Sequence, residues 1–144
     1  MNSFDFNYID SLPTKRVGLA RMTVSPVPET AERPAIVLVH GNMQGAWIYT
    51  HWLKVLHEAS IAATAVDVRG HGGLPTEDLI GAGLSDYGDD VAGVAQAFVH
   101  QPVLAGHSMG SVMVGVAASR TPVAGLILLA PSPPARLPGA QAVP

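Results

Sequence analysis

The chain has 144 residues and a formal net charge of -3, which is the size of a single domain, since domains span about 100–200 residues. Hydrophobic residues make up 48% of it and charged residues 13%, so we expect a compact core, and its 8 basic residues are too scattered to bind nucleic acid. The absence of cysteine excludes disulfides, cysteine-ligated zinc and a thiolate nucleophile, and no apolar run reaches the roughly 18 residues of a membrane span.

Residues 1–34 are predicted to form an N-terminal region of one or more strands followed by a turn. Residues 1–10 carry two aspartates and lack the basic and apolar regions of a secretory signal, so we expect a cytoplasmic protein without a membrane partner. Residues 16–25 mix apolar and polar positions in a strand-like way. Three prolines in residues 25–34 then indicate a turn.

Residues 35–130 are predicted to form the core of an α/β fold. Short apolar runs alternate there with segments whose apolar residues recur at helical spacing, and this alternation is typical of a doubly wound, mostly parallel sheet with helices on both faces. The expected elements are a strand at 35–39, a helix at 48–59, a strand at 61–66, a helix at 85–98, a strand at 102–105, a helix at 109–119 and a strand at 123–130. Residues 131–144 contain five prolines and no periodicity, which predicts a linker or tail.

A G-x-S-x-G motif, residues 106–110, lies between the third of these strands and its helix. In that context the serine lies on a sharp turn, and the glycines two residues away let the strand and the helix approach each other closely. The hydroxyl of Ser108 is therefore expected at the carboxyl end of a parallel sheet, where open α/β sheets bind their ligands. The alternative is a tight glycine-serine turn without chemistry.

Two further motifs accompany the serine. Residues 40–47 read HGNMQGAW directly after the first buried strand, and residues 67–72 read DVRGHG after the second. With these motifs in this order, the sequence resembles the α/β-hydrolase superfamily over residues 34–133. The first motif is similar to that of small esterases and methylesterases related to hydroxynitrile lyases, and the second resembles the loop after the fourth strand in lipase and esterase relatives.

The resemblance implies a set of site residues and no metal or cofactor. It makes Ser108 the nucleophile and gives the oxyanion hole to the backbone N–H groups of Asn42 and Met109. The side chains of Met43, Trp47 and His107 would flank the acyl pocket. For Met43 and Trp47, plain core packing is an equally open interpretation.

The catalytic base and its carboxylate are missing from their usual place. In this family the acid and then the histidine follow the serine. Here all six histidines precede Ser108, and the last acidic residue is Asp90. We therefore expect an α/β-hydrolase fold that lacks the cap and the last strands, with residues 123–130 as an edge strand that is apolar on both faces.

Three functions remain open. The first is a serine hydrolase for a small carboxylic ester or lactone, in which a second polypeptide or a missing segment supplies the triad acid and histidine. The second is a non-catalytic binding module that associates with itself through its open sheet edge. The third keeps an enzyme on the same scaffold but gives it hydroxynitrile-lyase or cofactor-free oxygen chemistry.

Overall fold

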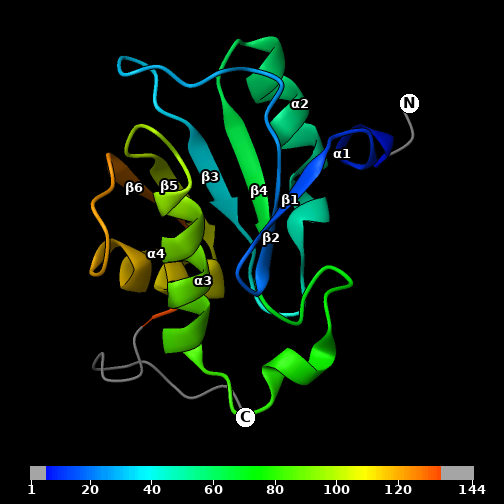
Figure 1. The fold of residues 1–144 in the computed structure, drawn as a ribbon, viewed down its shortest axis with the longest axis vertical. Coiled ribbons are helices and arrows are strands. Elements are labelled where there is room, and N and C mark those ends of the chain that lie inside the picture. The colour runs from blue at the N-terminus through cyan, green and yellow to red at the C-terminus, as the bar shows by residue number, and fades with distance from the viewer. Residues whose placement is uncertain (1–5, 134–144) are drawn as a thin grey trace.

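The computed structural model describes residues 6–133, which form one six-stranded sheet between two layers of helices (Figure 1). Most of the expected proline-rich tail, residues 134–144, lies outside the described residues. The elements in chain order are α1 (Asn7–Asp10), β1 (Thr14–Val17), β2 (Ala20–Thr23), β3 (Ile36–Val39), the 3-10 helix η1 (Ala46–Tyr49), α2 (Thr50–Glu58), β4 (Ala63–Asp67), the 3-10 helix η2 (Thr76–Leu79), α3 (Leu84–Gln96), β5 (Val103–His107), α4 (Met109–Ala118) and β6 (Gly125–Leu129).

The sheet has the strand order β1-β2-β4-β3-β5-β6. The strands from β4 to β6 are parallel to one another, which confirms the predicted α/β class with a mostly parallel sheet. At the other end, β1 and β2 form an antiparallel hairpin, and β2 also runs antiparallel to β4. Most of this hairpin lies in the strand-like stretch expected at residues 16–25, and Gly18 turns the chain between its strands with a φ of 57°.

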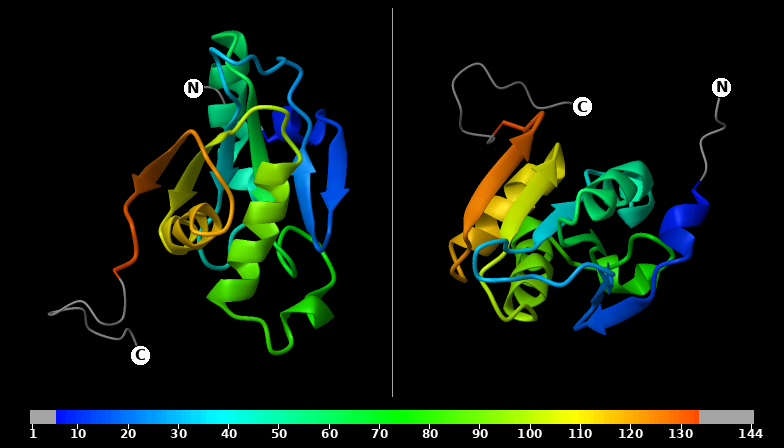
Figure 2. Two further views of the ribbon diagram at one scale, coloured as in Figure 1. Left: turned by 60° about the vertical axis from the view of Figure 1, so that its left-hand side comes forward. Right: turned by 90° about the horizontal axis from the view of Figure 1, so that it is seen from above.

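The two faces of the sheet carry separate cores, and β3 contributes to both. Val37 and Val39 pack with α3 and α4 on one face, whereas Leu38 packs with α1, η1 and α2 on the other. Figure 2, seen from above, shows these helices on opposite sides of the strands. Because side chains alternate along a strand, a run without polar residues such as 36–39 is stable only when both of its faces are covered.

The parallel strands end at the same edge of the sheet, and this edge gathers the three motifs. His40 follows β3, Asp67 ends β4 and Ser108 follows β5. A parallel register places these three strand ends side by side, although residues 40 and 108 are 68 positions apart in the chain. Within the described part of the chain, no helix is both long and apolar enough to cross a membrane.

β6 is the outermost strand on its side of the sheet and pairs, among the described strands, with β5 alone. Its central side chains Leu126, Ile127 and Leu128 are 44%, 42% and 50% exposed. A groove of about 750 Å³ runs between this strand and α4, lined mainly by apolar atoms of Val112, Val116 and the residues after β6. The strand is thus apolar and half exposed on both faces, as the sequence predicted.

Candidate functional site

Ser108 stands on a strained turn between β5 and α4. Its φ of 54° and ψ of -120° lie in a region that a residue with a Cβ rarely adopts. Three backbone hydrogen bonds hold the turn: the Ser108 N–H donates to the Leu129 oxygen at 2.9 Å, and the Ser108 oxygen accepts the N–H groups of Ser111 at 3.0 Å and Ser132 at 3.3 Å. The Ser108 side chain is half-buried, and its Oγ lies 3.4 Å from Oγ of Ser132.

The two glycines of the motif are required by close backbone approaches. A Cβ on Gly106 would overlap the Gly110 carbonyl and lie 2.6 Å from the Ser111 nitrogen. A Cβ on Gly110 would overlap the Val39 carbonyl oxygen and lie 2.5 Å from that of His40. Because the obstructing atoms are backbone, they cannot move aside as a flexible side chain would. The glycines thus let α4 pack directly on the ends of β5 and β3.

The loop after β3 lies against this turn. A Cβ on Gly41 would lie 3.1 Å from Cβ of Ser108, which shows how closely the two segments pack. The fully buried ring of His40 contacts the Gly41 oxygen through Nδ1 at 2.7 Å, and its Nε2 accepts the Val68 N–H at 3.4 Å. Nδ1 therefore carries the ring proton. Burial lowers the pKa of His40, so the imidazole is neutral at pH 7.

The amides assigned to the oxyanion hole come from the two segments that meet here. Asn42 follows Gly41, and Met109 is the first residue of α4. Among the described residues, no acceptor takes the backbone N–H of either one. At the first turn of a helix, unpaired N–H groups and the positive end of the helix dipole favour negative charge.

Asp67, at the end of β4, holds the neighbouring loops in place. One carboxylate oxygen accepts Nε and Nη2 of Arg21 at 3.1 and 2.7 Å, and the other accepts the Ala46 N–H at 2.7 Å. Only 5% of Asp67 is exposed. A Cβ on Gly72 would overlap this carboxylate, and the φ of Gly72 is 61°. The carboxylate therefore fixes the start of η1 and the glycine-rich loop, and it does not face Ser108.

A cavity of about 550 Å³ lies beside the loop after β3, between that loop and the segment after β4. Met43 and Trp47, two of the three predicted pocket residues, line it together with Gln44, His71 and Leu79. They are 87% and 49% exposed, which makes them surface side chains of a hollow and not core residues. His107 does not line this cavity; its Nδ1 lies 3.4 Å from Oε1 of Gln44.

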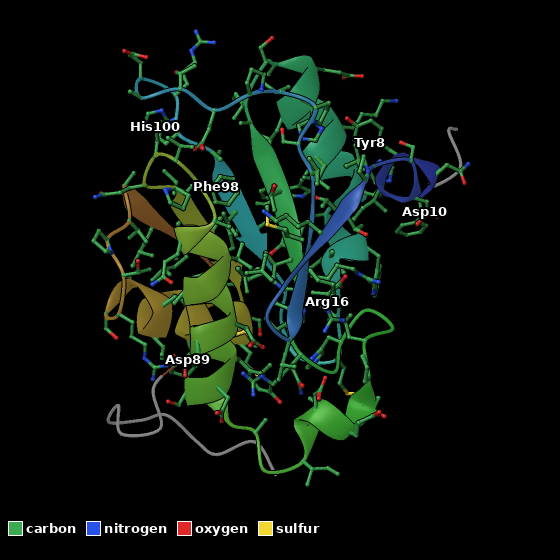
Figure 3. The ribbon with its side chains drawn as sticks, viewed as in Figure 1. Tyr8, Asp10, Arg16, Asp89, Phe98 and His100 are labelled. Carbon is green, nitrogen blue, oxygen red and sulfur yellow. The ribbon has the colours of Figure 1, made fainter. Side chains whose placement is uncertain are left out.

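The histidines are dispersed through the fold. His71 bonds the Arg69 oxygen through Nδ1 at 2.9 Å and lies 5.0 Å, between ring centroids, from His40. His57 on α2 is only 8% exposed, because α1 covers it and the Tyr8 hydroxyl lies 2.6 Å from its Nδ1. His51 packs on Phe6, and His100 lies in the loop before β5, at the opposite end of that strand from Ser108 (Figure 3).

No histidine among residues 6–133 hydrogen-bonds to Oγ of Ser108. His107 and His40 bond to the loop after β3 instead. Sequence reasoning missed Gln44 and Ser132, which contact His107 and Ser108 in the serine turn. The only signal for Gln44 was its position three residues after Gly41, in a turn.

Comparison with known proteins places this geometry in a family. The family model "Serine aminopeptidase, S33" matches residues 30–141. The rice protein "Probable esterase PIR7A" (Oryza sativa subsp. indica) is 36% identical over 106 residues, which cover 69% of this chain and 39% of the relative. "Esterase PIR7B" (Oryza sativa subsp. japonica) is 32% identical over 111 residues, which cover 73% and 41%. The chain thus spans about two fifths of the length of these relatives.

Solved structures give the same result for the fold. The thioesterase domain from the curacin biosynthetic pathway superposes with a TM-score of 0.71 and 21% identity, over 88% of this chain and 48% of that one. A proline iminopeptidase-related protein from Thermus thermophilus superposes with a TM-score of 0.64 and 25% identity, over 84% and 44%. The strained serine turn, the sheet order and these matches agree, and the chain belongs to the serine aminopeptidase S33 family of the α/β-hydrolase superfamily.

Proposed function

We propose that this chain carries the nucleophile and the oxyanion hole of a serine hydrolase that cleaves small carboxylic esters or lactones through an acyl-Ser108 intermediate. One observation carries the proposal: Ser108 stands on a strained turn, beside two backbone amides, of Asn42 and Met109, that have no acceptor among the described residues. A tight turn with no chemistry has no need for such strain, which costs about 1–3 kcal/mol. The rice esterases support the choice of ester substrates.

The reaction uses these groups in a fixed order. Oγ of Ser108 attacks the carbonyl carbon while a base removes its proton, and the carbonyl oxygen becomes an oxyanion. The N–H groups of Asn42 and Met109 donate to that oxyanion, and one such donor contributes about 3–4 kcal/mol to transition-state stabilisation. The tetrahedral intermediate expels the alcohol, which takes the proton from the base. Water then attacks the acyl-Ser108 ester while the base removes a proton from the water, and the acid leaves as Oγ of Ser108 recovers that proton.

The base and its carboxylate come from a further stretch of polypeptide, on this chain or on a second one, that completes the sheet at β6. Both faces of β6 are half exposed, and its outer edge pairs with no strand among residues 6–133. The relatives are more than twice as long as the part that this chain matches. A parallel strand paired with β6 would close its open edge, and the residues that follow that strand would lie at the same edge of the sheet as Ser108.

The substrate's apolar group fits the cavity of about 550 Å³ beside the loop after β3. Met43, Trp47 and Leu79 give it an apolar wall, and Gln44 connects it to the serine turn. A pocket of this size holds a small ester group.

Labelling with a fluorophosphonate probe tests the nucleophile. We expect modification of Ser108 in the complete assembly, and no modification of the Ser108→Ala variant. Ser132→Ala is the matched control, because Ser132 is the hydroxyl nearest to Ser108 and has no part in the proposed reaction. Turnover of p-nitrophenyl esters that persists in Ser108→Ala would mean that the nucleophile is another residue.

The native mass of the purified protein tests the completion of the sheet. We expect a species heavier than the 14.9 kDa chain, and we expect the additional polypeptide to carry a histidine that lies beside Ser108. A dimer of two identical chains without serine labelling would instead support the non-catalytic binding module. Cleavage of cyanohydrins in preference to p-nitrophenyl esters would favour hydroxynitrile-lyase chemistry.

A further inference from the structure

The side chain of Gln44 connects the loop after β3 to the serine turn. Its Oε1 accepts the Gly41 N–H at 3.0 Å and lies 3.4 Å from Nδ1 of His107, the residue before Ser108. Gly41 is buried and Gln44 is half-buried, so solvent competes weakly for these contacts. A backbone N–H needs an acceptor, so the oxygen of the Gln44 amide, and not its NH2 group, faces Gly41.

Two side chains together fix the peptide planes around Gly41. Gln44 accepts the Gly41 N–H, and Nδ1 of His40 donates to the Gly41 oxygen at 2.7 Å. The Gly41 N–H is therefore not available to a substrate. The peptide between Gly41 and Asn42 is trans, so the Asn42 N–H points away from the buried His40 ring, in the direction opposite to the Gly41 oxygen.

The atoms packed around Gly41 leave little room for the loop after β3 to lie in another position. A Cβ on Gly41 would lie 3.0 Å from Oε1 of Gln44, 3.1 Å from Cβ of Ser108 and 3.2 Å from the His107 oxygen. The loop, the amide of Gln44 and the serine turn are thus in contact with one another. A small rotation of the loop would move the Asn42 N–H relative to Ser108, and an oxyanion donor is effective only within a few tenths of an ångström of its place.

We propose that Gln44 is a positioning residue that holds the oxyanion loop on the serine turn and keeps His107 in the tautomer with its proton on Nδ1. The positioning role rests on the proposed function, because it concerns the Asn42 donor. Gln44 has the required chemistry: a neutral amide oxygen has two lone pairs and can accept from both Gly41 and His107. It also adds no charge beside a developing oxyanion, which a carboxylate at this position would repel.

Nuclear magnetic resonance on the 144-residue chain tests the two contacts without any need for catalysis. Gln44→Leu keeps the volume of the side chain but removes the acceptor. We expect the Gly41 amide hydrogen to exchange about tenfold faster in this variant, which corresponds to the loss of one ordinary hydrogen bond. We also expect the ring nitrogen shifts of His107 to lose the pattern of a protonated Nδ1. Gln44→Glu, which retains an acceptor, should restore both.

Gln96→Leu is the matched control, because Gln96 is an exposed glutamine at the end of α3. It should leave the exchange of Gly41 and the tautomer of His107 unchanged. Equal exchange of the Gly41 amide in the native chain and in Gln44→Leu would overturn the proposal, as would an unchanged His107 tautomer. If Gln44→Leu is poorly folded, the native chain and Gln44→Glu still decide, since a His107 ring protonated on Nε2 in the native chain refutes the contact.

Failure of the proposed function gives a different result. If Ser108 never reacts with the fluorophosphonate but both magnetic resonance effects appear, then Gln44 positions the loop and the hydrolase assignment is wrong. If Ser108 reacts in the complete assembly, we expect Gln44→Leu to lower kcat of ester cleavage at least tenfold with little change in KM, because an oxyanion donor acts mainly in the transition state. An equal kcat would refute the role of Gln44 and leave Ser108 as the nucleophile.

Discussion

Two glycines of α4 are expected to respond in opposite ways to the same substitution. Gly110→Ala places a methyl group against the carbonyl oxygens of Val39 and His40, the latter at 2.5 Å, whereas ordinary contacts of a Cβ begin at 3.4 Å. Gly115→Ala, five residues later in the same helix, adds a methyl group with no atom within 4 Å. The pair therefore separates the cost of close packing from the general effect of alanine in a helix.

The expected changes in the free energy of unfolding follow from the groups that must move to make room for each methyl group. In Gly110→Ala, α4 has to shift by about an ångström from the end of β3, and this opens the packing of Met113 and Val114, which are fully buried in the core. Overpacking against rigid neighbours costs about 3 kcal/mol. Gly115→Ala should instead stabilise the helix by about 0.5–1 kcal/mol, because alanine loses less backbone entropy than glycine. We therefore expect a difference of about 4 kcal/mol between the two variants.

Urea unfolding followed by circular dichroism measures the difference. With a slope of about 2 kcal/mol per molar urea, the two midpoints should lie about 2 M apart, with the native chain between them and nearer to Gly115→Ala. A Gly110→Ala variant as stable as the native chain would show that α4 does not pack on the carbonyls of β3, and the account of the serine turn would then be wrong.

Three further predictions concern the residues around the site. Asp67→Asn should lower the free energy of unfolding by about 2 kcal/mol in urea, because it weakens a buried acceptor of Arg21 and Ala46. As a control, Asp89→Asn breaks an exposed ion pair with Arg120 and should change the free energy of unfolding by less than about 0.5 kcal/mol. Burial lowers the pKa of His40, so below pH 6.5 the unfolded chain binds a proton at this residue that the folded chain does not. The free energy of unfolding should therefore fall with decreasing pH, by up to about 1.4 kcal/mol per pH unit. In unfolding experiments between pH 7.5 and 5, the His40→Asn variant should lack this contribution to the pH dependence. Ser108→Gly relieves the backbone strain and should raise the midpoint of thermal unfolding by a few degrees, or about 1 kcal/mol, while it abolishes fluorophosphonate labelling; a lower midpoint would argue against strain.

The local pattern of the sequence was enough to predict the parallel core and the serine turn. Uninterrupted apolar runs at residues 36–39 and 103–105 require cover on both faces, and their alternation with helical segments favours a parallel sheet between helices. The glycines around Ser108 indicate a close strand-to-helix turn for the same local reason. Such signals are carried by residues within a few positions of one another, so no tertiary information is needed to interpret them.

Contacts between distant segments could not be predicted in this way. His57 lies on α2 and is buried because α1 covers it: the hydroxyl of Tyr8, 49 residues earlier in the chain, lies 2.6 Å from its Nδ1. Figure 3 shows Tyr8 on α1. The hairpin of β1 and β2 joins the sheet beside β4 through two residue pairs, the ion pair of Arg21 with Asp67, and hydrogen bonds of Thr23 with the segment 64–65. Neither contact leaves a periodic trace in the sequence.

The sequence by itself determined the class of fold, the place of the serine and the absence of any histidine after it. The tertiary structure alone decided how the loop after β3 is held: Gln44, 63 residues before His107, contacts both Gly41 and the serine turn. The physical reason is the distance along the chain over which each kind of interaction acts. Backbone preferences and hydrophobic periodicity act over a few residues, whereas a hydrogen bond between two loops depends on the register of β3 beside β5, which is set by the packing of the whole sheet.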